Sequence, residues 1–287
     1  MTTFKVACIQ TTSTPDIAEN VAWVRARIEQ ARADGADLIC TPEITDMIEP
    51  NRAFRMQKAE PEASHPALAA FREAAAKAGA WLLIGSIGVK VEGGERLANR
   101  SYLLDASGNI VATYDKIHMF DVDLAGGESY RESATFRPGD RAVLADTPWG
   151  LLGMTVCYDL RFPHLYRTLA QAGARFITIP AAFTRPTGSA HWHVLQRARA
   201  IETGCYIFAP AQCGEHTQGR KTYGHSLIVA PWGEVLADGG DDVGIISAEI
   251  DTAKIDEARR MVPSLQHDRP YAAPVAAAKP GLRAAGD

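Results

Sequence analysis

The chain has 287 residues and a mass of 31.0 kDa, and 46% of its residues are hydrophobic and 22% charged. This composition excludes a short disulfide-stapled peptide and a fibrous repeat, and it argues against a disordered tail protein. Thirty lysines and arginines against 34 aspartates and glutamates give a net charge of −4, which disfavours nucleic acid and anionic lipid as partners. The length allows one large α/β domain or two smaller ones.

The N-terminus and the cysteines point to the cytoplasm. MTTFKVACIQ lacks the basic and apolar regions of a signal peptide, and no window approaches the roughly 18 apolar residues of a membrane helix. The five cysteines are odd in number and show no CxxC spacing, which disfavours a disulfide framework. We therefore expect a cytoplasmic protein without a membrane segment.

Strands and helices alternate along the chain. In the first half we expect a strand at 4–10, a helix at 17–33 closed by Gly35, a strand at 37–41, a helix at 66–78, a strand at 81–87 and a hairpin of 101–104 with 110–114. In the second half we expect a strand at 151–156, a helix at 163–171, a strand at 175–180, a helix at 189–203, strands at 205–212, 225–230, 235–236 and 244–250, and a helix at 251–261 capped by Asp251.

Two stretches lack this alternation. Residues 120–140 are polar and glycine-rich and predict a long loop, a feature that is usually functional or mobile at such length. The tail from 271 to 287 is rich in Ala and Pro, and we expect it to extend over the surface or a neighbouring subunit. No linker divides the rest, so the sequence predicts one α/β domain over residues 1–270.

Three reactive side chains each follow an apolar strand. They are Glu43 in LICTPEITD, Lys116 in ATYDKIHMFD and Cys157 in GMTVCYDLRFP. Ligands in open α/β sheets bind at the carboxyl ends of strands, so the three side chains could meet over one pocket. A carboxylate could then take the proton of the thiol, and a lysine could stabilise the oxyanion of a tetrahedral intermediate.

Each of these residues also has an ordinary interpretation. A lone Glu or Lys after a strand is most often a solvated loop residue, and a lone Cys is often a core thiol. However, the charged Asp159 and Arg161 directly after Cys157 are unusual for a strand that stays buried. The conjunction favours a catalytic cysteine, but spacing alone does not prove that the three groups converge.

These motifs resemble the three signatures of the nitrilase superfamily, the carbon–nitrogen hydrolases. The matching segments are Pro-Glu at 42–43, DKIHMFD at 115–121 and CYDLRFP at 157–163, and the similarity extends from about residue 4 to 270. The resemblance implies a four-layer α-β-β-α sandwich, no metal or organic cofactor, and a homo-oligomer, most simply a dimer, that associates through helical faces. It also implies that Glu43 is the general base, Lys116 stabilises the transition state and Cys157 is the nucleophile.

The resemblance assigns two further roles and narrows the subfamily. A second glutamate falls on Glu132 in YRES, and the backbone N–H of Tyr158 joins Lys116 in the oxyanion site. AFTRPTGSAHW, RARAIETGCY and DVDLAGGESYRES most resemble the deaminated glutathione amidases. The omega-amidases, which act on α-ketoglutaramate, typically have Phe-Ala where this chain has Phe162-Pro163. An omega-amidase, an N-carbamoyl amino acid hydrolase and a catalytically silent interaction protein remain alternatives.

The substrate of that subfamily predicts the rest of the site. Its α-ketoglutaryl half carries a carboxylate, which a guanidinium binds best. The first candidate is Arg161, with Arg131 and Arg185 behind it, and the residues expected on the leaving-group side are Phe183, Thr184 and Thr187. His191 and His193 could be read as a metal pair, but no carboxylate or cysteine lies at ligand spacing, so we expect no metal. We expect His225 to hold a turn or a neighbouring loop.

Overall fold

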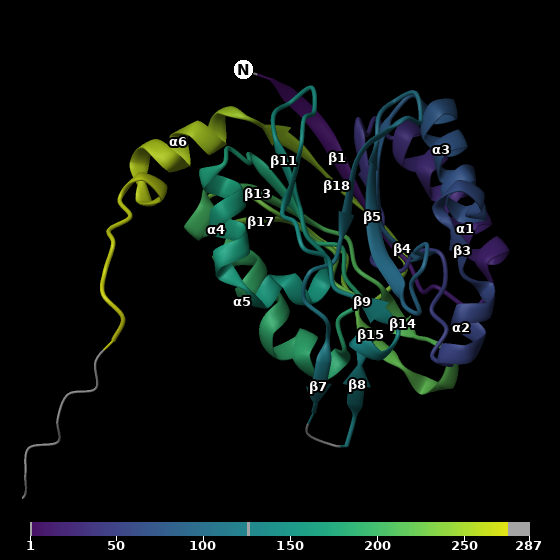
Figure 1. Cartoon of the computed structure of the whole chain (residues 1–287). Helices are drawn as coiled ribbons and strands as arrows, with labels where there is room; N and C mark the ends of the chain where they lie inside the picture. Colours follow the sequence, from purple (N-terminus) through teal and green to yellow (C-terminus); the bar gives the residue numbers. More distant parts are fainter. Residues whose placement is uncertain (1, 125–126, 275–287) are drawn as a thin grey trace, which may run out of the picture.

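The structure is a computed structural model that describes residues 2–124 and 127–274. Two β-sheets face each other at its centre (Figure 1). The path of the first sheet is β18-β1-β2-β4-β5-β6, with β3 and β9 beside it. Its strands are β1 (Thr3–Gln10), β2 (Leu38–Cys40), β3 (Glu60–Pro61), β4 (Trp81–Lys90), β5 (Leu97–Leu104), β6 (Ile110–Asp115), β9 (Phe136–Arg137) and β18 (Gly244–Asp251).

The second sheet has the order β10-β11-β12-β13-β16-β17. Its strands are β10 (Val143–Ala145), β11 (Leu152–Met154), β12 (Phe176–Thr178), β13 (Tyr206–Ala209), β16 (Leu227–Val229) and β17 (Val235–Asp238). Strands β11, β12 and β13 are parallel, so the segments that follow them leave the same edge of the sheet. Two small hairpins pair β7 (Asp121–Asp123) with β8 (Ser129–Arg131) and β14 (Cys213–Glu215) with β15 (Lys221–Tyr223).

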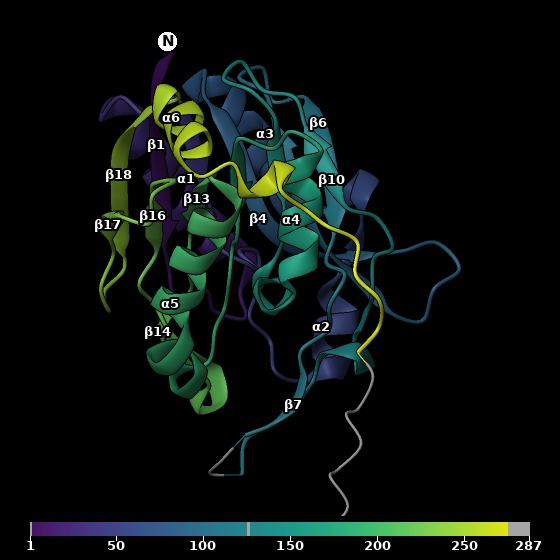
Figure 2. The same ribbon diagram turned by 90° about the vertical axis from the view of Figure 1, so that its left-hand side faces the viewer.

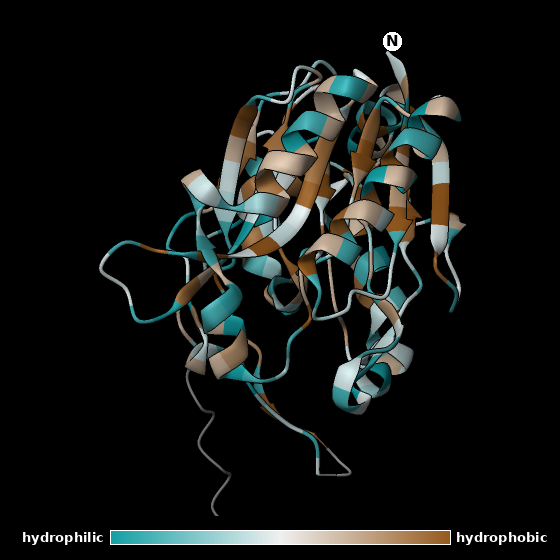
Figure 3. Cartoon of the chain, turned by 90° about the vertical axis from the view of Figure 1, so that its right-hand side faces the viewer, coloured by the Kyte–Doolittle hydropathy of each residue, from teal (hydrophilic) through white to brown (hydrophobic). Residues whose placement is uncertain are grey.

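Helices cover the outer face of each sheet. Helices α1 (Ile17–Ala33) and α3 (Pro66–Ala78) pack on the first sheet, whose strands appear brown and hydrophobic in Figure 3. Helices α4 (Pro163–Gln171) and α5 (Arg185–Thr203) pack on the second sheet, as Figure 2 shows. Helices α2 (Arg52–Lys58) and α6 (Ala253–Met261) complete the set. No helix in the described part of the chain has the length and apolarity that crossing a membrane requires.

The alternation of side chains along β1 explains the layers. Phe4, Val6 and Cys8 belong to the core between the two sheets, whereas Ala7 and Ile9 belong to the core beneath α1 and α3. Successive side chains of a strand point to opposite faces, so a strand that is apolar throughout needs cover on both sides. The expected four-layer α-β-β-α sandwich is confirmed.

The helix boundaries follow from their caps. The Asp16 side chain accepts a hydrogen bond from the Glu19 N–H at 3.0 Å and starts α1. Helix α3 starts at Pro66 and ends before Gly79, whose φ of 61° lies in the left-handed region that glycine tolerates. Helices α1, α3 and α4 have the bounds that the sequence predicts.

Several boundaries differ from the prediction. Helix α5 begins at Arg185, four residues early, because Pro186 occupies its first turn, where no N–H is needed. Thr252, not Asp251, precedes α6, although the Asp251 carboxylate accepts the Ala253 N–H at 2.9 Å. Residues 120–140 are not one irregular loop, because they include β7, β8 and β9. The predicted tail lies mostly outside the described residues, and the domain limit at 270 stays a prediction.

Candidate active site

Glu43 lies just after β2, in a turn that presses against β4. The Ile44 N–H donates to Ser86 Oγ at 2.8 Å, and the Ser86 N–H donates to the Pro42 carbonyl at 3.2 Å. This approach needs a glycine at position 85, because a Cβ there would lie 2.0 Å from the Thr41 carbonyl oxygen. The Glu43 side chain is thereby buried, with 4% of the residue exposed.

Lys116 follows β6 and lies between two carboxylates. Its Nζ is 2.8 Å from Glu43 Oε1 and 2.8 Å from Glu132 Oε2. The backbone N–H of Lys116 donates to the Asn99 carbonyl at 3.0 Å, which extends the pairing of β6 with β5 by one residue. The ammonium group is therefore directed into the site by the sheet itself.

Cys157 begins a short 3-10 turn, Cys157–Arg161, that two residues separate from the end of β11. Its φ of 51° is unusual for a residue that is not glycine, and its N–H donates to the Pro180 carbonyl at 2.9 Å. In the described residues the Tyr158 N–H makes no hydrogen bond, so it is available as a donor. A strained turn that presents a nucleophile beside a free N–H suits an oxyanion site.

The ionic groups hold one another in their charged forms. Burial alone would raise the pKa of Glu43, but Lys116 outweighs this and the pKa is lower than usual. Burial alone would lower the pKa of Lys116, but the charges of Glu132 and Glu43 hold it well above its usual value. Lys116 therefore stays protonated beside two carboxylates.

The thiol of Cys157 lies against this cluster. Burial raises its pKa well above the usual value, the Glu43 charge raises it further, and Lys116 opposes both. The resting site thus combines a neutral thiol with an ionised carboxylate that can accept the proton. This is the arrangement that a general base and a nucleophile need before substrate arrives.

Asn99 is a member of the site that sequence reasoning missed. Its Nδ2 donates to Glu43 Oε1 at 3.0 Å and to Glu132 Oε1 at 3.1 Å. Glu43 Oε2 also accepts the Ala182 N–H at 2.9 Å, so both oxygens of the carboxylate are engaged. Asn99 lies inside β5 with no motif around it, so only the three-dimensional structure brings it to the site.

A cavity of about 350 Å³ opens over these groups. Among the residues predicted from sequence, its lining includes Glu43, Lys116, Glu132, Cys157, Tyr158, Arg131, Phe183, Thr184 and Thr187. Arg161 is not in the lining: its guanidinium lies 5.9 Å from the Tyr158 ring and 5.5 Å from the Phe183 ring. Arg185 is also outside, 4.0 Å from Asp241. The fold therefore gathers the predicted triad but leaves the first-choice arginine behind two aromatic rings.

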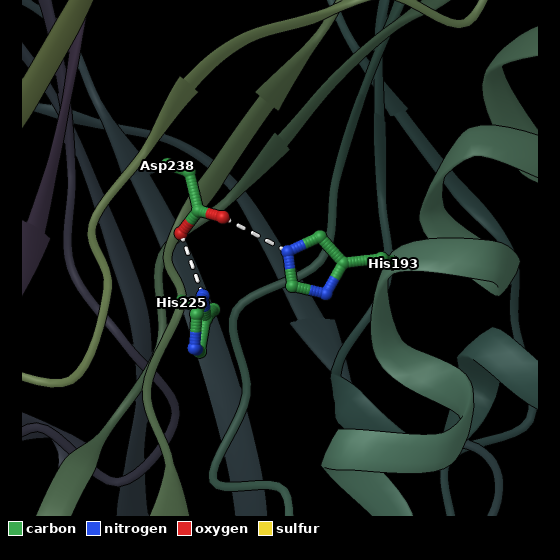
Figure 4. Close-up of side chains that lie close together, drawn as sticks. All are labelled: His193, His225 and Asp238. Atoms are coloured by element: carbon green, nitrogen blue, oxygen red, sulfur yellow. Dashed lines mark hydrogen bonds and ion pairs between the residues drawn. The ribbon is translucent and has the colours of Figure 1, made fainter.

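The histidines form a separate cluster (Figure 4). Asp238 accepts from His193 Nε2 at 2.9 Å and from His225 Nδ1 at 2.8 Å, so the fold supplies the carboxylate that the local sequence around His193 lacks. The ligand atoms of the three residues lie within 4.8 Å of one another, and none of these residues lines the cavity. The cluster ties α5 to the end of β17, and His225, with a φ of 53°, lies in the irregular segment between β15 and β16.

Comparison with known proteins agrees with this geometry. The carbon-nitrogen hydrolase family model matches residues 5–260. The deaminated glutathione amidase of Yersinia enterocolitica is 42% identical, over 92% of both chains, and that of Homo sapiens is 41% identical over 92% of this chain and 82% of its own. The crystal structure of the C. elegans NitFhit protein superposes with a TM-score of 0.86 at 35% identity, over 93% of this chain and 65% of that one. The chain therefore belongs to the carbon-nitrogen hydrolase family and is a hydrolase of carbon–nitrogen bonds other than peptide bonds.

Proposed function

We propose that the chain is a deaminated glutathione amidase, which hydrolyses its substrate to 2-oxoglutarate and cysteinylglycine. The observation that carries the proposal is the placement of Cys157 beside the ionised Glu43 and Lys116 in one cavity. The relatives named deaminated glutathione amidase support the choice of substrate, because they match most of the chain. The reaction breaks one amide bond and consumes one water.

The first half of the reaction forms a thioester. Glu43 takes the thiol proton as the sulfur of Cys157 attacks the amide carbonyl carbon. The negative charge that develops on the carbonyl oxygen is stabilised by Lys116 and by the unpaired N–H of Tyr158. Glu43 then gives the proton to the departing amine, and the carbon–nitrogen bond breaks.

The second half releases the acid. Water enters the position left by the amine, and Glu43 accepts its proton as the oxygen attacks the thioester. The sulfur leaves as the tetrahedral intermediate collapses, and the proton returns to Cys157. Glu132 and Asn99 hold the pair in place through both halves, because Glu132 accepts from Lys116 Nζ and the Asn99 amide donates to Glu43.

A substrate competition tests the proposal. We expect the enzyme to prefer deaminated glutathione to α-ketoglutaramate, with release of cysteinylglycine measured by mass spectrometry. Preferential release of ammonia from α-ketoglutaramate would instead indicate an omega-amidase, and carbon dioxide from an N-carbamoyl amino acid would indicate a carbamoylase. Cys157→Ala should abolish both turnover and the acyl adduct. Turnover by that variant would contradict the mechanism, and an unreactive wild type would favour a silent interaction protein.

We also propose a homodimer in the cytoplasm. Exposed hydrophobic side chains include Val194 and Ile201 on α5, Trp232 in the turn after β16, and Met261 and Val262 at the end of α6, and three of them, Ile201, Trp232 and Val262, line one hollow. Apolar surface of this kind is often covered by a partner. Light scattering on the purified protein tests the dimer, and Ile201→Glu should convert it to a monomer if α5 is the interface. A monomeric wild type would contradict this assignment.

A further inference from the structure

The lining of the cavity carries more positive than negative charge. It contains the three carboxylates Glu43, Glu49 and Glu132, and the five cations Arg52, Arg55, Lys116, Arg131 and Arg220. Some of these charges are neutralised locally: Lys116 by Glu43 and Glu132, Arg131 by Asp123, and Glu49 by Lys58. Within residues 2–124 and 127–274, Arg52, Arg55 and Arg220 have no carboxylate within ion-pair distance, and of these Arg52 is exposed whereas Arg55 is buried and Arg220 is partly buried. Asp46, Glu132 and Glu49 act on the charge of Arg55 at longer range, but neither Arg55 nor Arg220 has a direct ion-pair partner in the described residues, so both can bind an anionic ligand.

The Arg55 guanidinium is anchored by hydrogen bonds from two of its nitrogens to one backbone carbonyl. Its Nε and Nη2 donate to the Glu49 carbonyl at 2.9 and 2.7 Å, and the group lies 5.4 Å from the Phe136 ring. No acceptor in the described structure takes the remaining Nη1. The residue is only 9% exposed, and burial, with the nearby charge of Arg220, lowers its pKa to about 10. Arg55 and Arg220 both line the cavity that contains Cys157, so one ligand in that cavity can meet both guanidinium groups.

Arg220 is held in the same manner. Its Nη2 donates to the Ala182 carbonyl at 3.2 Å, and its guanidinium lies 5.8 Å from the Tyr130 ring. Its Nε is buried and has no partner in the described residues. Because the Ala182 N–H donates to Glu43, the Arg220 side chain is anchored on the same residue that positions the general base. Both arginines thus lie in the cavity of the reacting groups, and each has guanidinium N–H groups without an acceptor in the described residues.

We propose that Arg55 and Arg220 form the subsite that binds a carboxylate of the substrate. The inference rests on the proposed function, since deaminated glutathione carries two carboxylates, one on its 2-oxo acid end and one on its glycine. A carboxylate between the two guanidinium groups would accept their unused N–H donors and relieve their mutual repulsion. The subsite selects anionic amides and places their scissile bond beside Cys157.

Three substrates distinguish the two carboxylates. Steady-state kinetics of Arg55→Gln and Arg220→Gln are compared with wild type on deaminated glutathione, on its C-terminal glycinamide form and on α-ketoglutaramate. A KM raised at least tenfold on all three assigns the subsite to the 2-oxo acid carboxylate. A rise on deaminated glutathione alone assigns it to the glycine carboxylate. An unchanged KM on all three overturns the proposal.

Two controls separate this proposal from the proposed function. Arg72→Gln removes a guanidinium that also donates to a backbone carbonyl, that of Gly108, but lies outside the cavity, and it should leave KM unchanged.

Calorimetric binding of 2-oxoglutarate and of cysteinylglycine to the Cys157→Ala variant needs no turnover. If the wild type does not hydrolyse deaminated glutathione, the proposed function is wrong. The subsite is still supported if the Cys157→Ala protein binds a product and the Cys157→Ala/Arg220→Gln double variant does not. Equal product binding with and without Arg220 refutes it. If Arg55→Gln does not fold, Arg220→Gln carries the test.

Discussion

Asp159 accepts a hydrogen bond from the His118 N–H at 3.0 Å and contacts His118 Nδ1 at 2.7 Å, although the two residues are 41 positions apart. The other carboxylate oxygen of Asp159 accepts from the Val156 N–H and from the Tyr114 hydroxyl, at 2.9 and 2.7 Å. A single buried side chain therefore joins the turn that carries Cys157 to the segment that carries Lys116. The distance between nucleophile and lysine depends on this contact.

Asp159→Asn should weaken both the fold and the reaction. The amide cannot accept all four of these contacts, so a buried donor loses its partner, which costs about 1–3 kcal/mol of unfolding free energy. We expect kcat to fall more than KM rises, because the reacting groups move while the cavity remains. Urea unfolding and steady-state kinetics measure both effects. Asp105→Asn, in an exposed turn, is the matched control, and equal kcat values for the two variants would contradict the positioning role.

Gly85→Ala should displace the general base. A Cβ at this position would lie 2.0 Å from the Thr41 carbonyl oxygen and 2.3 Å from that of Pro42, so the turn carrying Glu43 must move. Gly88→Ala on the same strand is the control, because its Cβ would meet only side-chain atoms at 3.6 Å or more. We expect activity to fall by at least tenfold in the first variant, about 1.4 kcal/mol in barrier height, and to persist in the second. Similar activities in both would show that the turn tolerates the shift.

Glu132→Gln should change the pH dependence of the reaction. The charge of Glu132 raises the pKa of Lys116, so its removal lowers that pKa, and the lysine loses its proton at a lower pH than in the wild type. The alkaline limb of the kcat profile should therefore move toward neutral pH. Glu128→Gln, on the same hairpin but bonded to the Tyr130 hydroxyl, should leave the limb in place. An unmoved limb in Glu132→Gln would show that Lys116 does not depend on this partner.

Glu43→Gln should separate thiol reactivity from turnover. Burial and the Glu43 charge raise the pKa of Cys157, so removing the charge lowers the pKa and leaves Lys116 to stabilise the thiolate. Alkylation by iodoacetamide at neutral pH should then be faster than in the wild type, while hydrolysis is lost with the base. Mass spectrometry of the labelled protein measures the rate, with Cys157→Ala as the blank. Slower alkylation in Glu43→Gln would contradict the assigned effect of the carboxylate.

A chelator should leave activity unchanged, because the His193–His225–Asp238 cluster does not line the cavity. Activity is measured after dialysis against EDTA and again after zinc is restored. Asp238→Asn should lower the melting temperature, because it weakens two contacts that tie α5 to β17. Loss of activity that zinc reverses would instead make the cluster a metal site linked to catalysis.

The sequence was most informative where local chemistry decides the structure. Helices α1 and α3 were predictable because apolar spacing and a closing glycine, Gly35 or Gly79, mark them. Helix α2 was missed because its one buried residue is Arg55, which creates no apolar stripe, while Phe54 in the same helix is exposed. Its contacts with the core come from Arg55 and the partly buried Met56, which are adjacent in sequence and so create no hydrophobic period.

The residues of the candidate site also fall into those that the sequence predicts and those that it does not. Glu43, Lys116, Glu132 and Cys157 carry recognisable motifs, and the structure brings them together. Asn99, Arg55 and Arg220 come from a strand, a short helix and a loop whose local sequences give no such signal. Arg161 shows the converse, because its proximity to Cys157 in sequence does not place it in the lining of the cavity. The local sequence does not reveal which side chains from distant segments will meet, because their contacts depend on how the two sheets pack together.

Strand β18 pairs with β1 along eight residues, from Thr3 opposite Asp251 to Gln10 opposite Gly244. The edge of the first sheet therefore stays open until the last strand has been synthesised. A chain still on the ribosome can hold Glu43, Lys116 and Cys157 and yet lack the strand that protects the sheet beneath them. Exposed edges invite pairing with other chains, so the nascent protein is most vulnerable to aggregation late in its synthesis. Its activity should arise only after β18 has paired with β1.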